Sequence, residues 1–195
     1  MRKSYFGDSK FDKAYFTGKH PAGYEDGYEK NILEGDYGCY SSFKKAAKFI
    51  KDLGVKDYLE IGCACGYLME ELMKYGIRVT GWDVSEYIIN RADPSVRPFM
   101  ELKDIKEIVS LPDKSFDLVH VSTVLGYVPE AELDFYLSEI KRITRKYAVL
   151  YAGTPEDAPE ENGIRKINKP DEWWNKQFAE YFKEKDISRF LWEAL

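Results

Sequence analysis

The stretch Tyr58-Leu59-Glu60-Ile61-Gly62-Cys63-Ala64-Cys65-Gly66 indicates the fold of this chain, because a short apolar strand runs straight into a turn with two glycines. A helix is predicted to begin directly afterwards, at Tyr67. Gly62 and Gly66 suit such a turn, since a residue without a Cβ lets the backbone bend tightly and approach a ligand closely. The simpler alternative is a turn that serves only the packing of strand against helix. Ala64 replaces the middle glycine of the dinucleotide-binding fingerprint, which counts against a bound pyrophosphate.

Strands and helices alternate on both sides of this turn. Such alternation predicts an α/β fold, a three-layer sandwich in which helices cover both faces of a mostly parallel, twisted sheet. The predicted strands are 57–61, 78–82, 99–102, 116–122 and 147–151, and the predicted helices are 43–53, 67–73, 86–91 and one that begins at Pro129.

The two ends of the chain differ in composition from this core. Residues 1–40 are rich in aromatic residues and glycine, which predicts an N-terminal arm or lid that packs through aromatic contacts. Residues 41–195 are predicted to form a single α/β domain of ordinary size. Its last part, 153–195, begins as an acidic loop and continues as a helix from Pro170 to about Lys183.

Composition excludes several classes of protein. The 29 basic and 34 acidic residues give a net charge of −5, which argues against the broad basic face of a nucleic-acid-binding protein. No apolar run is long enough to span a membrane, and the polar N-terminus does not resemble a signal peptide. Three cysteines and two histidines predict neither a disulfide framework nor a metal site, and they favour a reducing, cytoplasmic location.

Acidic residues follow two further strands of the predicted sheet. Asp83 ends the strand after the glycine turn, where a carboxylate can accept hydrogen bonds from both hydroxyls of a ribose. The alternative for Asp83 is a helix cap or first-turn acid, which the helix dipole also favours. Asp104 follows the third strand and could accept from an adenine amino group, although an exposed loop residue is the simpler interpretation.

Taken together, these segments resemble the class I S-adenosylmethionine (SAM)-dependent methyltransferases over about residues 41–152. The resemblance implies that SAM donates a methyl group, that S-adenosylhomocysteine (SAH) is released, and that the enzyme works by positioning an in-line displacement. It is carried by Glu60, Gly62, Gly66, Asp83, Asp104, Ile105 and the run from Leu111-Pro112 to Phe116-Asp117. The implied SAM-binding residues are Glu60, Gly62, Cys63, Ala64, Gly66, Asp83, Val84, Asp104, Ile105, Ser122 and Thr123.

Some features depart from the pattern of that family. Gly126-Tyr127 replaces a common Glu-His pair after the fourth strand, so the sequence offers no obvious general base. The closing antiparallel hairpin has only 164–168 and 189–192 as candidate strands, which predicts a shortened sheet. His120 is predicted to be a core residue. The candidates for a catalytic role are His20, Tyr24, Tyr28 and Tyr127.

The functional hypothesis is a methyltransferase for a small-molecule acceptor. One alternative is a SAM- or SAH-binding module without turnover, which acts through a protein partner. A protein or tRNA methyltransferase and an NAD-binding oxidoreductase are further alternatives. The sequence leaves open the acceptor, the methylated atom and the oligomeric state.

Overall fold

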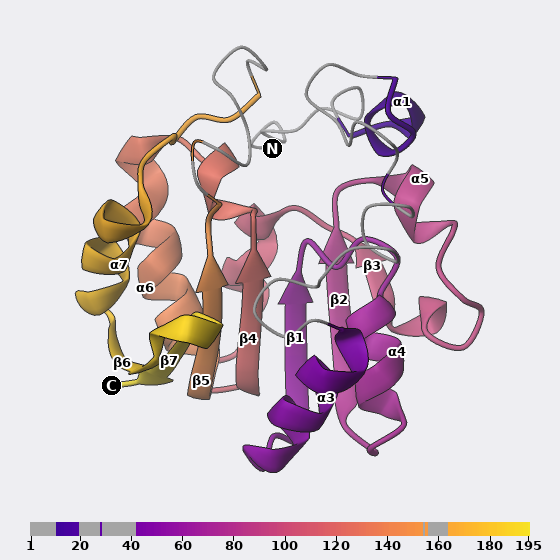
Figure 1. Cartoon of the computed structure of the whole chain (residues 1–195), viewed down its shortest axis with the longest axis horizontal. Helices are drawn as coiled ribbons and strands as arrows, with labels where there is room; N and C mark the ends of the chain where they lie inside the picture. Colours follow the sequence, from indigo (N-terminus) through magenta and orange to yellow (C-terminus); the bar gives the residue numbers. More distant parts are fainter. Residues whose placement is uncertain (1–10, 20–27, 29–41, 154, 156–163) are drawn as a thin grey trace.

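The computed structural model describes residues 11–19, 28, 42–153, 155 and 164–195 of the 195-residue chain (Figure 1). Within these residues one sheet has the strand order β3-β2-β1-β4-β5-β7-β6. The first five strands run parallel, and β7 is antiparallel to both β5 and β6. The strands are β1 (Asp57–Ile61), β2 (Arg78–Asp83), β3 (Met100–Leu102), β4 (Phe116–Ser122), β5 (Thr144–Tyr151), β6 (Phe182–Asp186) and β7 (Leu191–Ala194).

Helices cover both faces of this sheet, so the predicted three-layer α/β sandwich is confirmed. On one face α3 (Phe43–Asp52) and α4 (Tyr67–Met73) pack in a cluster with Tyr58 and Leu118. On the other face α6 (Leu133–Ile143) and α7 (Asp171–Ala179) pack in a cluster with Leu59 and Val119. Figure 1 places two short helices, α1 (Lys13–Phe16) and α5 (Glu86–Ile89), beyond the carboxyl ends of the strands.

The central strands are buried on both faces. Alternate residues of β1 belong to the two different core clusters, and four of its five positions are buried. A strand covered on both sides reads as a continuous apolar run, which is why β1 and β4 were recognisable in the sequence. The ionisable residues Glu60, Asp117 and His120 are exceptions in these two strands, and all three are buried.

The C-terminal hairpin is the main correction to the predicted fold. The sheet is complete, and the first strand of its hairpin is β6 at Phe182–Asp186, not 164–168. The last helix ends at Ala179 instead of continuing to about Lys183. Phe182 is the one apolar residue in β6 and is fully buried, so the strand shows no apolar alternation that would identify it. Pro129 also does not begin a helix, because a 3-10 turn at Glu130–Glu132 precedes α6.

The topology indicates where a ligand binds. β1 lies between β2 and β4, so the chain leaves it first in one direction and later returns on the other side. In open α/β sheets ligands bind beyond the carboxyl ends of the strands at such a reversal point. Here those ends are Gly62, Asp83 and Ser122. Within the described ranges of the chain, no helix has the length and apolar character needed to cross a membrane.

Candidate active site

The glycine turn lies between the carboxyl ends of β1 and β2. The backbone N–H groups of Gly62 and Cys63 both donate to the carbonyl oxygen of Trp82, at 2.7 Å and 3.1 Å. Gly62 has a φ of +83°, and a Cβ at this position would lie 2.5 Å from Cγ2 of Val124. Glycine is therefore required at position 62 for both backbone conformation and space.

Two non-glycine residues beside the turn adopt the left-handed conformation. Ala64 has a φ of +49° and Thr123 a φ of +56°. This conformation is unfavourable for residues with a side chain and is concentrated at functional sites. The backbone N–H of Thr123 donates to Tyr151 at 2.6 Å, and its hydroxyl donates to the carbonyl of Ser122 at 2.8 Å, so the loop after β4 is held firmly.

Asp83 presents a fixed carboxylate at the end of β2. Its Oδ2 accepts from the N–H of Ala64 and its Oδ1 from the N–H of Ser85, both at 2.9 Å. Burial raises the pKa of Asp83 to about 6, although these backbone donors lower it in part. Both oxygens keep lone pairs for a further donor, since a carboxylate accepts about four hydrogen bonds.

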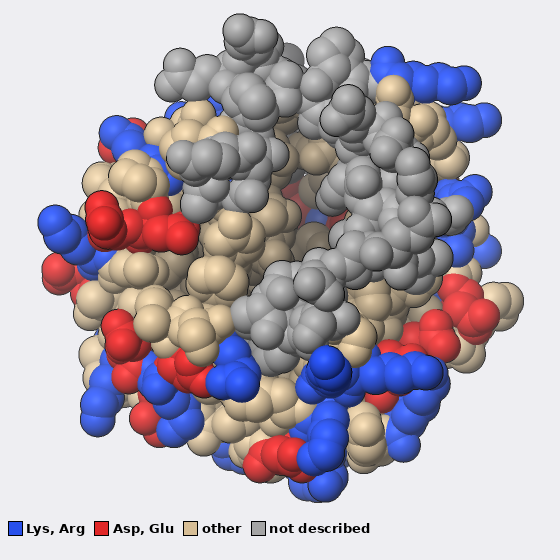
Figure 2. All heavy atoms as spheres, in the orientation of Figure 1, with Lys and Arg blue, Asp and Glu red and all other residues tan. Residues whose placement is uncertain are grey.

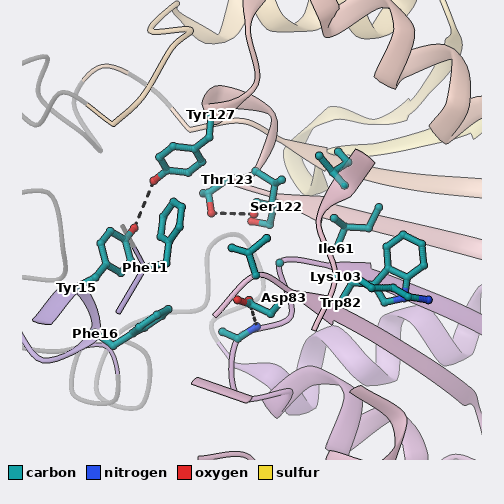
Figure 3. A pocket seen from close by; sticks show the side chains of 15 residues that line it. Phe11, Tyr15, Phe16, Ile61, Trp82, Asp83, Lys103, Ser122, Thr123 and Tyr127 are labelled. Atoms are coloured by element: carbon teal, nitrogen blue, oxygen red, sulfur yellow. Dashed lines mark hydrogen bonds between the residues drawn. The ribbon is translucent and has the colours of Figure 1, made fainter. Parts of the chain in front are cut away.

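A cleft of about 630 Å³, open to solvent, lies above these residues. This volume includes the open space at the mouth of the cleft. Figure 2 shows a hollow in this face of the molecule, and Figure 3 shows the cleft from close by. It is lined by Phe11, Tyr15, Phe16, Ile61, Gly62, Ala64, Trp82, Asp83, Val84, Lys103, Ile105, Ser122, Thr123, Val124 and Tyr127.

Residues 11–19 supply one wall of the cleft. Asp12 caps α1 by accepting from the N–H groups of Ala14 and Tyr15, at 2.8 Å and 3.1 Å. Besides the packing of its aromatic rings, two polar contacts join the segment to the core. The Ser85 hydroxyl donates to the carbonyl of Phe11 at 2.5 Å, and the hydroxyls of Tyr15 and Tyr127 lie 3.4 Å apart. Sequence reasoning placed these aromatic residues in an arm but did not identify them as pocket residues.

Most of the predicted site residues meet at this cleft. Those that line it are Gly62, Ala64, Asp83, Val84, Ile105, Ser122, Thr123 and Tyr127. Cys63 and Gly66 belong to the same turn without lining the cleft, and Tyr28 stacks on Tyr67 with ring centroids 6.3 Å apart. The remaining candidates, His20 and Tyr24, lie outside the described residues.

Asp104 makes a local structural contact next to the cleft. Its side chain accepts from the N–H of Lys106 at 3.1 Å, and Glu107 accepts from the N–H of Asp104 at 3.2 Å. This reciprocal arrangement is a capping box at the start of the 3-10 helix Ile105–Ser110. Asp104 is not among the lining residues, whereas its neighbours Lys103 and Ile105 are.

Glu60 lies in a buried polar group beneath the turn. Its Oε1 is 3.5 Å from Nδ1 of His120, and that nitrogen is 2.7 Å from the hydroxyl of Tyr58. Among the described residues Oε2 of Glu60 has no hydrogen-bond partner. Burial raises the pKa of Glu60 to about 8 and lowers that of His120 to about 4, so both groups favour their neutral forms near pH 7.

Trp82 and Lys103 form the far end of the cleft. The ammonium of Lys103 lies 4.8 Å from the centre of the Trp82 ring, within cation–π range, and 2.8 Å from a carboxylate oxygen of Glu101. The indole N–H of Trp82 donates to the other oxygen of Glu101 at 3.2 Å. Sequence reasoning missed both residues, and the only available signal was their position at the ends of two adjacent strands.

A family model described as a methyltransferase domain matches residues 59–152. Among curated proteins the chain is 27% identical over 166 residues to the probable pectin methylesterase CGR2 of Arabidopsis thaliana. The matched stretch covers 78% of this chain and 63% of that protein. It is also 27% identical over 142 residues to the probable methyltransferase ltbC of Aspergillus luteorubrus, covering 65% and 50%. The chain thus spans less than two thirds of the length of these relatives.

Solved structures share the fold. A SAM-dependent methyltransferase from Archaeoglobus fulgidus superposes with a TM-score of 0.59 at 20% identity, covering 81% of this chain and 77% of that one. The magnesium protoporphyrin IX methyltransferase of Synechocystis, solved with bound SAM, gives a TM-score of 0.57 at 17% identity and covers 77% and 76%. At these identities the similarity establishes the architecture.

Proposed function

Because residues 59–152 match a family model described as a methyltransferase domain and the chain has the sheet order described above, we propose that this protein transfers a methyl group from SAM to a small-molecule acceptor. The observation that carries this proposal is the Asp83 carboxylate, which faces the cleft beside the glycine turn. It is held by two backbone N–H groups and retains acceptor capacity for ribose hydroxyls.

The residues around Asp83 fit the rest of the cofactor. Val84 and Ile105 follow β2 and β3, line the cleft, and offer apolar surface for an adenine ring. On the other side, Gly62 and Ser122 line the space where the methionine part would lie. A Cβ at Gly62 would crowd Val124, so the turn and the loop after β4 are already in close contact.

SAM supplies an electrophilic methyl group on a sulfonium. The contribution of the chain is to hold donor and acceptor in line and to exclude water. The wall formed by residues 11–19 serves the second purpose, since Phe11, Tyr15 and Phe16 cover one side of the cleft. In this proposal residues 1–40 form the lid and residues 41–195 the SAM-binding domain.

The name of the Arabidopsis relative describes hydrolysis of an ester, and the cleft favours methyl transfer instead. An esterase needs a nucleophile activated by a base. The hydroxyls of Ser122 and Thr123 line the cleft, but none of the described lining residues is a histidine. His120 is buried and bonded to Tyr58.

The acceptor is proposed to be a small molecule rather than a nucleic acid. The net charge of the chain is −5, and Figure 2 shows acidic and basic side chains intermixed over the described part of this face. The location is proposed to be reducing and cytoplasmic, because three cysteines do not suggest a disulfide framework.

The test is calorimetric titration with SAM, SAH and NAD. We expect both sulfur nucleosides to bind and NAD not to bind. Asp83→Asn should weaken SAH binding at least tenfold, about 1.4 kcal/mol, because it removes the charged acceptor of the ribose hydroxyls. The matched control is Asp52→Asn, an exposed acid at the end of α3 that pairs with Lys48.

Two results would contradict the proposal. NAD binding in place of SAH would point to an oxidoreductase, and equal SAH affinity in wild type and Asp83→Asn would remove Asp83 from the site. Conversion of SAM to SAH that depends on an added acceptor would exclude a module that binds without turnover.

A further inference from the structure

Two tyrosine hydroxyls meet across the cleft. Tyr15 comes from α1 and Tyr127 from the 3-10 turn after β4, and their hydroxyl oxygens lie 3.4 Å apart (Figure 3). Phe11 stands nearly perpendicular to both rings, with centroid distances of 4.9 Å and 5.3 Å. We propose that this hydroxyl pair binds the reacting hydroxyl of the acceptor, and that the acceptor is an uncharged phenol.

The role of this pair rests on the proposed function, because it depends on how SAM lies in the cleft. If Asp83 binds the ribose of SAM, the adenine extends toward one end of the cleft and the methionine part toward the other. Trp82 and Lys103 mark one end, and Tyr15 and Tyr127 mark the other, with Asp83 between them (Figure 3). Val84 and Ile105, which follow β2 and β3, offer apolar surface for adenine on that side, so the methyl group is directed toward the tyrosines.

The chemistry of this second end favours an uncharged aromatic molecule. Among the described lining residues the charged ones are Asp83 and Lys103, and neither lies at the tyrosine end. Phe11, Phe16 and the two tyrosine rings provide aromatic surface there. Aromatic side chains stack on or pack edge-to-face against a flat ring, while a carboxylate or phosphate would lose its hydration without gaining a cation.

The hydroxyl pair is suited to binding a third hydroxyl. A separation of 3.4 Å exceeds the roughly 2.5–3.0 Å of a strong O–H···O hydrogen bond. Each phenol group can both donate and accept. An acceptor hydroxyl placed beside the pair could therefore donate to one tyrosine and accept from the other.

Methyl transfer to the phenol forms one bond and breaks one. The acceptor oxygen forms a bond to the methyl carbon, the carbon–sulfur bond breaks, and its electron pair stays on sulfur as the neutral thioether of SAH. The phenolic proton passes through the tyrosine hydroxyls to water. Cationic SAM and a neutral phenol thus give an aryl methyl ether, SAH and one proton, and no oxidant or reductant is required.

The first experiment uses acceptors matched in shape. Purified full-length protein and radiolabelled SAM are incubated with 4-propylphenol, 4-propylaniline, 4-propylbenzoate and 4-propylcyclohexanol. We expect the phenol to be methylated at least tenfold faster, by kcat/KM, than each of the others. The benzoate tests a charged acceptor and the cyclohexanol tests the requirement for an aromatic ring.

The second experiment removes one hydroxyl at a time. Tyr127→Phe and Tyr15→Phe should each lower kcat/KM for 4-propylphenol at least tenfold, mainly through kcat, and SAH affinity should stay within twofold. With 4-nitrophenol, which is already largely ionised at mildly alkaline pH, the same variants should lose less than threefold because no proton remains to be moved. Tyr75→Phe is the control, since Tyr75 is 46% exposed and follows α4 outside the cleft.

The outcomes separate this inference from the proposed function. Absence of SAH binding to the wild type would overturn both. SAH binding with faster methylation of the aniline or the benzoate, or with no methylation of any phenol, would overturn the acceptor class alone. Wild-type kinetics in both tyrosine variants, or an equal defect on 4-propylphenol and 4-nitrophenol, would overturn the role of the hydroxyl pair.

Discussion

The buried carboxyl groups at the two ends of the parallel sheet have pKa values shifted in opposite directions. At the carboxyl end, burial raises the pKa of both Asp83 and Glu60. At the amino end burial also acts to raise the pKa of Asp117, but the backbone N–H of Lys56 and the ammonium of Lys146 outweigh it, and the pKa lies below its usual value.

The amino end is an ion-pair network. Asp117 lies 3.1 Å from Nε of Arg145 and 3.3 Å from the ammonium of Lys146. Asp57, at the start of β1, pairs with Arg78 at 2.6 Å and also with Arg145. These contacts join the starts of β1, β2, β4 and β5.

This difference in pKa shift indicates that the acids at the amino end stabilise the fold, whereas Asp83 at the carboxyl end can bind a ligand. Cations from the chain itself compensate the acids at the amino end, so their effect is on folding. The acids at the carboxyl end are held by backbone dipoles or by neutral groups, which leaves Asp83 able to accept a ligand. Perturbed acids of the second kind are typical of functional sites. Variants at the two ends should therefore change different measured quantities.

The largest effect is expected for Gly62→Ala. The left-handed φ should destabilise the fold by about 1–2 kcal/mol, and overpacking against Val124 should add about 1–3 kcal/mol. The control is Gly54→Ala, because Gly54 has a similar φ of +73° and a Cβ added there would meet nothing within 4 Å. Urea unfolding and SAH titration measure both variants. Equal destabilisation, or normal SAH binding by Gly62→Ala, would contradict the crowding at the turn.

A smaller effect is expected at the amino end. Asp117→Asn should lower the free energy of unfolding by about 1–3 kcal/mol at pH 7, because the backbone N–H of Lys56 and two cations lose a charged partner. Since the folded pKa of Asp117 is depressed, this stability is present above the unfolded pKa and disappears as pH falls through the folded one. SAH affinity should not change. If Asp117→Asn left stability unchanged and weakened SAH binding, the claim that the amino end acts on folding alone would be wrong.

Much of the carboxyl end could be predicted from the sequence, because its signals are local. The strand, the turn and the acid at position 83 lie within residues 57–83, and the resemblance to class I methyltransferases is confirmed by the family match and the fold. The roles of individual residues in binding SAM stay predictions. Asp104 illustrates why, since it is neither the exposed loop residue of the simpler interpretation nor a lining residue of the cleft, but a buried acid in a capping box.

The remaining wall of the cleft depends on contacts between distant residues. Phe11 meets Ser85 across 74 positions, and Tyr15 meets Tyr127 across 112. No periodicity links such residues, so an aromatic arm could be predicted but its place in the cleft could not. The strand β6 was missed for a different reason. Its charged residues suit an exposed edge strand, which carries little apolar pattern.

The effect most specific to the carboxyl end, and the smallest one near pH 5, is expected for Glu60→Gln. A folded pKa of about 8 for Glu60, above its usual value of 4.5, means that its contribution to stability is complete below the usual value and is lost as pH rises through 8. The variant should thus differ little from wild type near pH 5 and become more stable than wild type as pH rises, by up to about 5 kcal/mol near pH 9 if the full shift is expressed. Taking the difference between the two proteins largely cancels the titration of His120 and Asp83, which also lie near this group.

The control for that comparison is Glu184→Gln, an exposed position on β6 whose substitution should shift stability equally at both pH values. Denaturant unfolding at pH 5 and pH 9 provides the measurement. A Glu60→Gln variant that is less stable than wild type at pH 9 would show that the carboxylate is compensated in the folded state, as Asp117 is, and the contrast between the two ends would fail. Weaker SAH binding by the same variant at pH 7 would instead support the prediction that Glu60 contacts the cofactor, since the substitution changes charge but hardly changes shape.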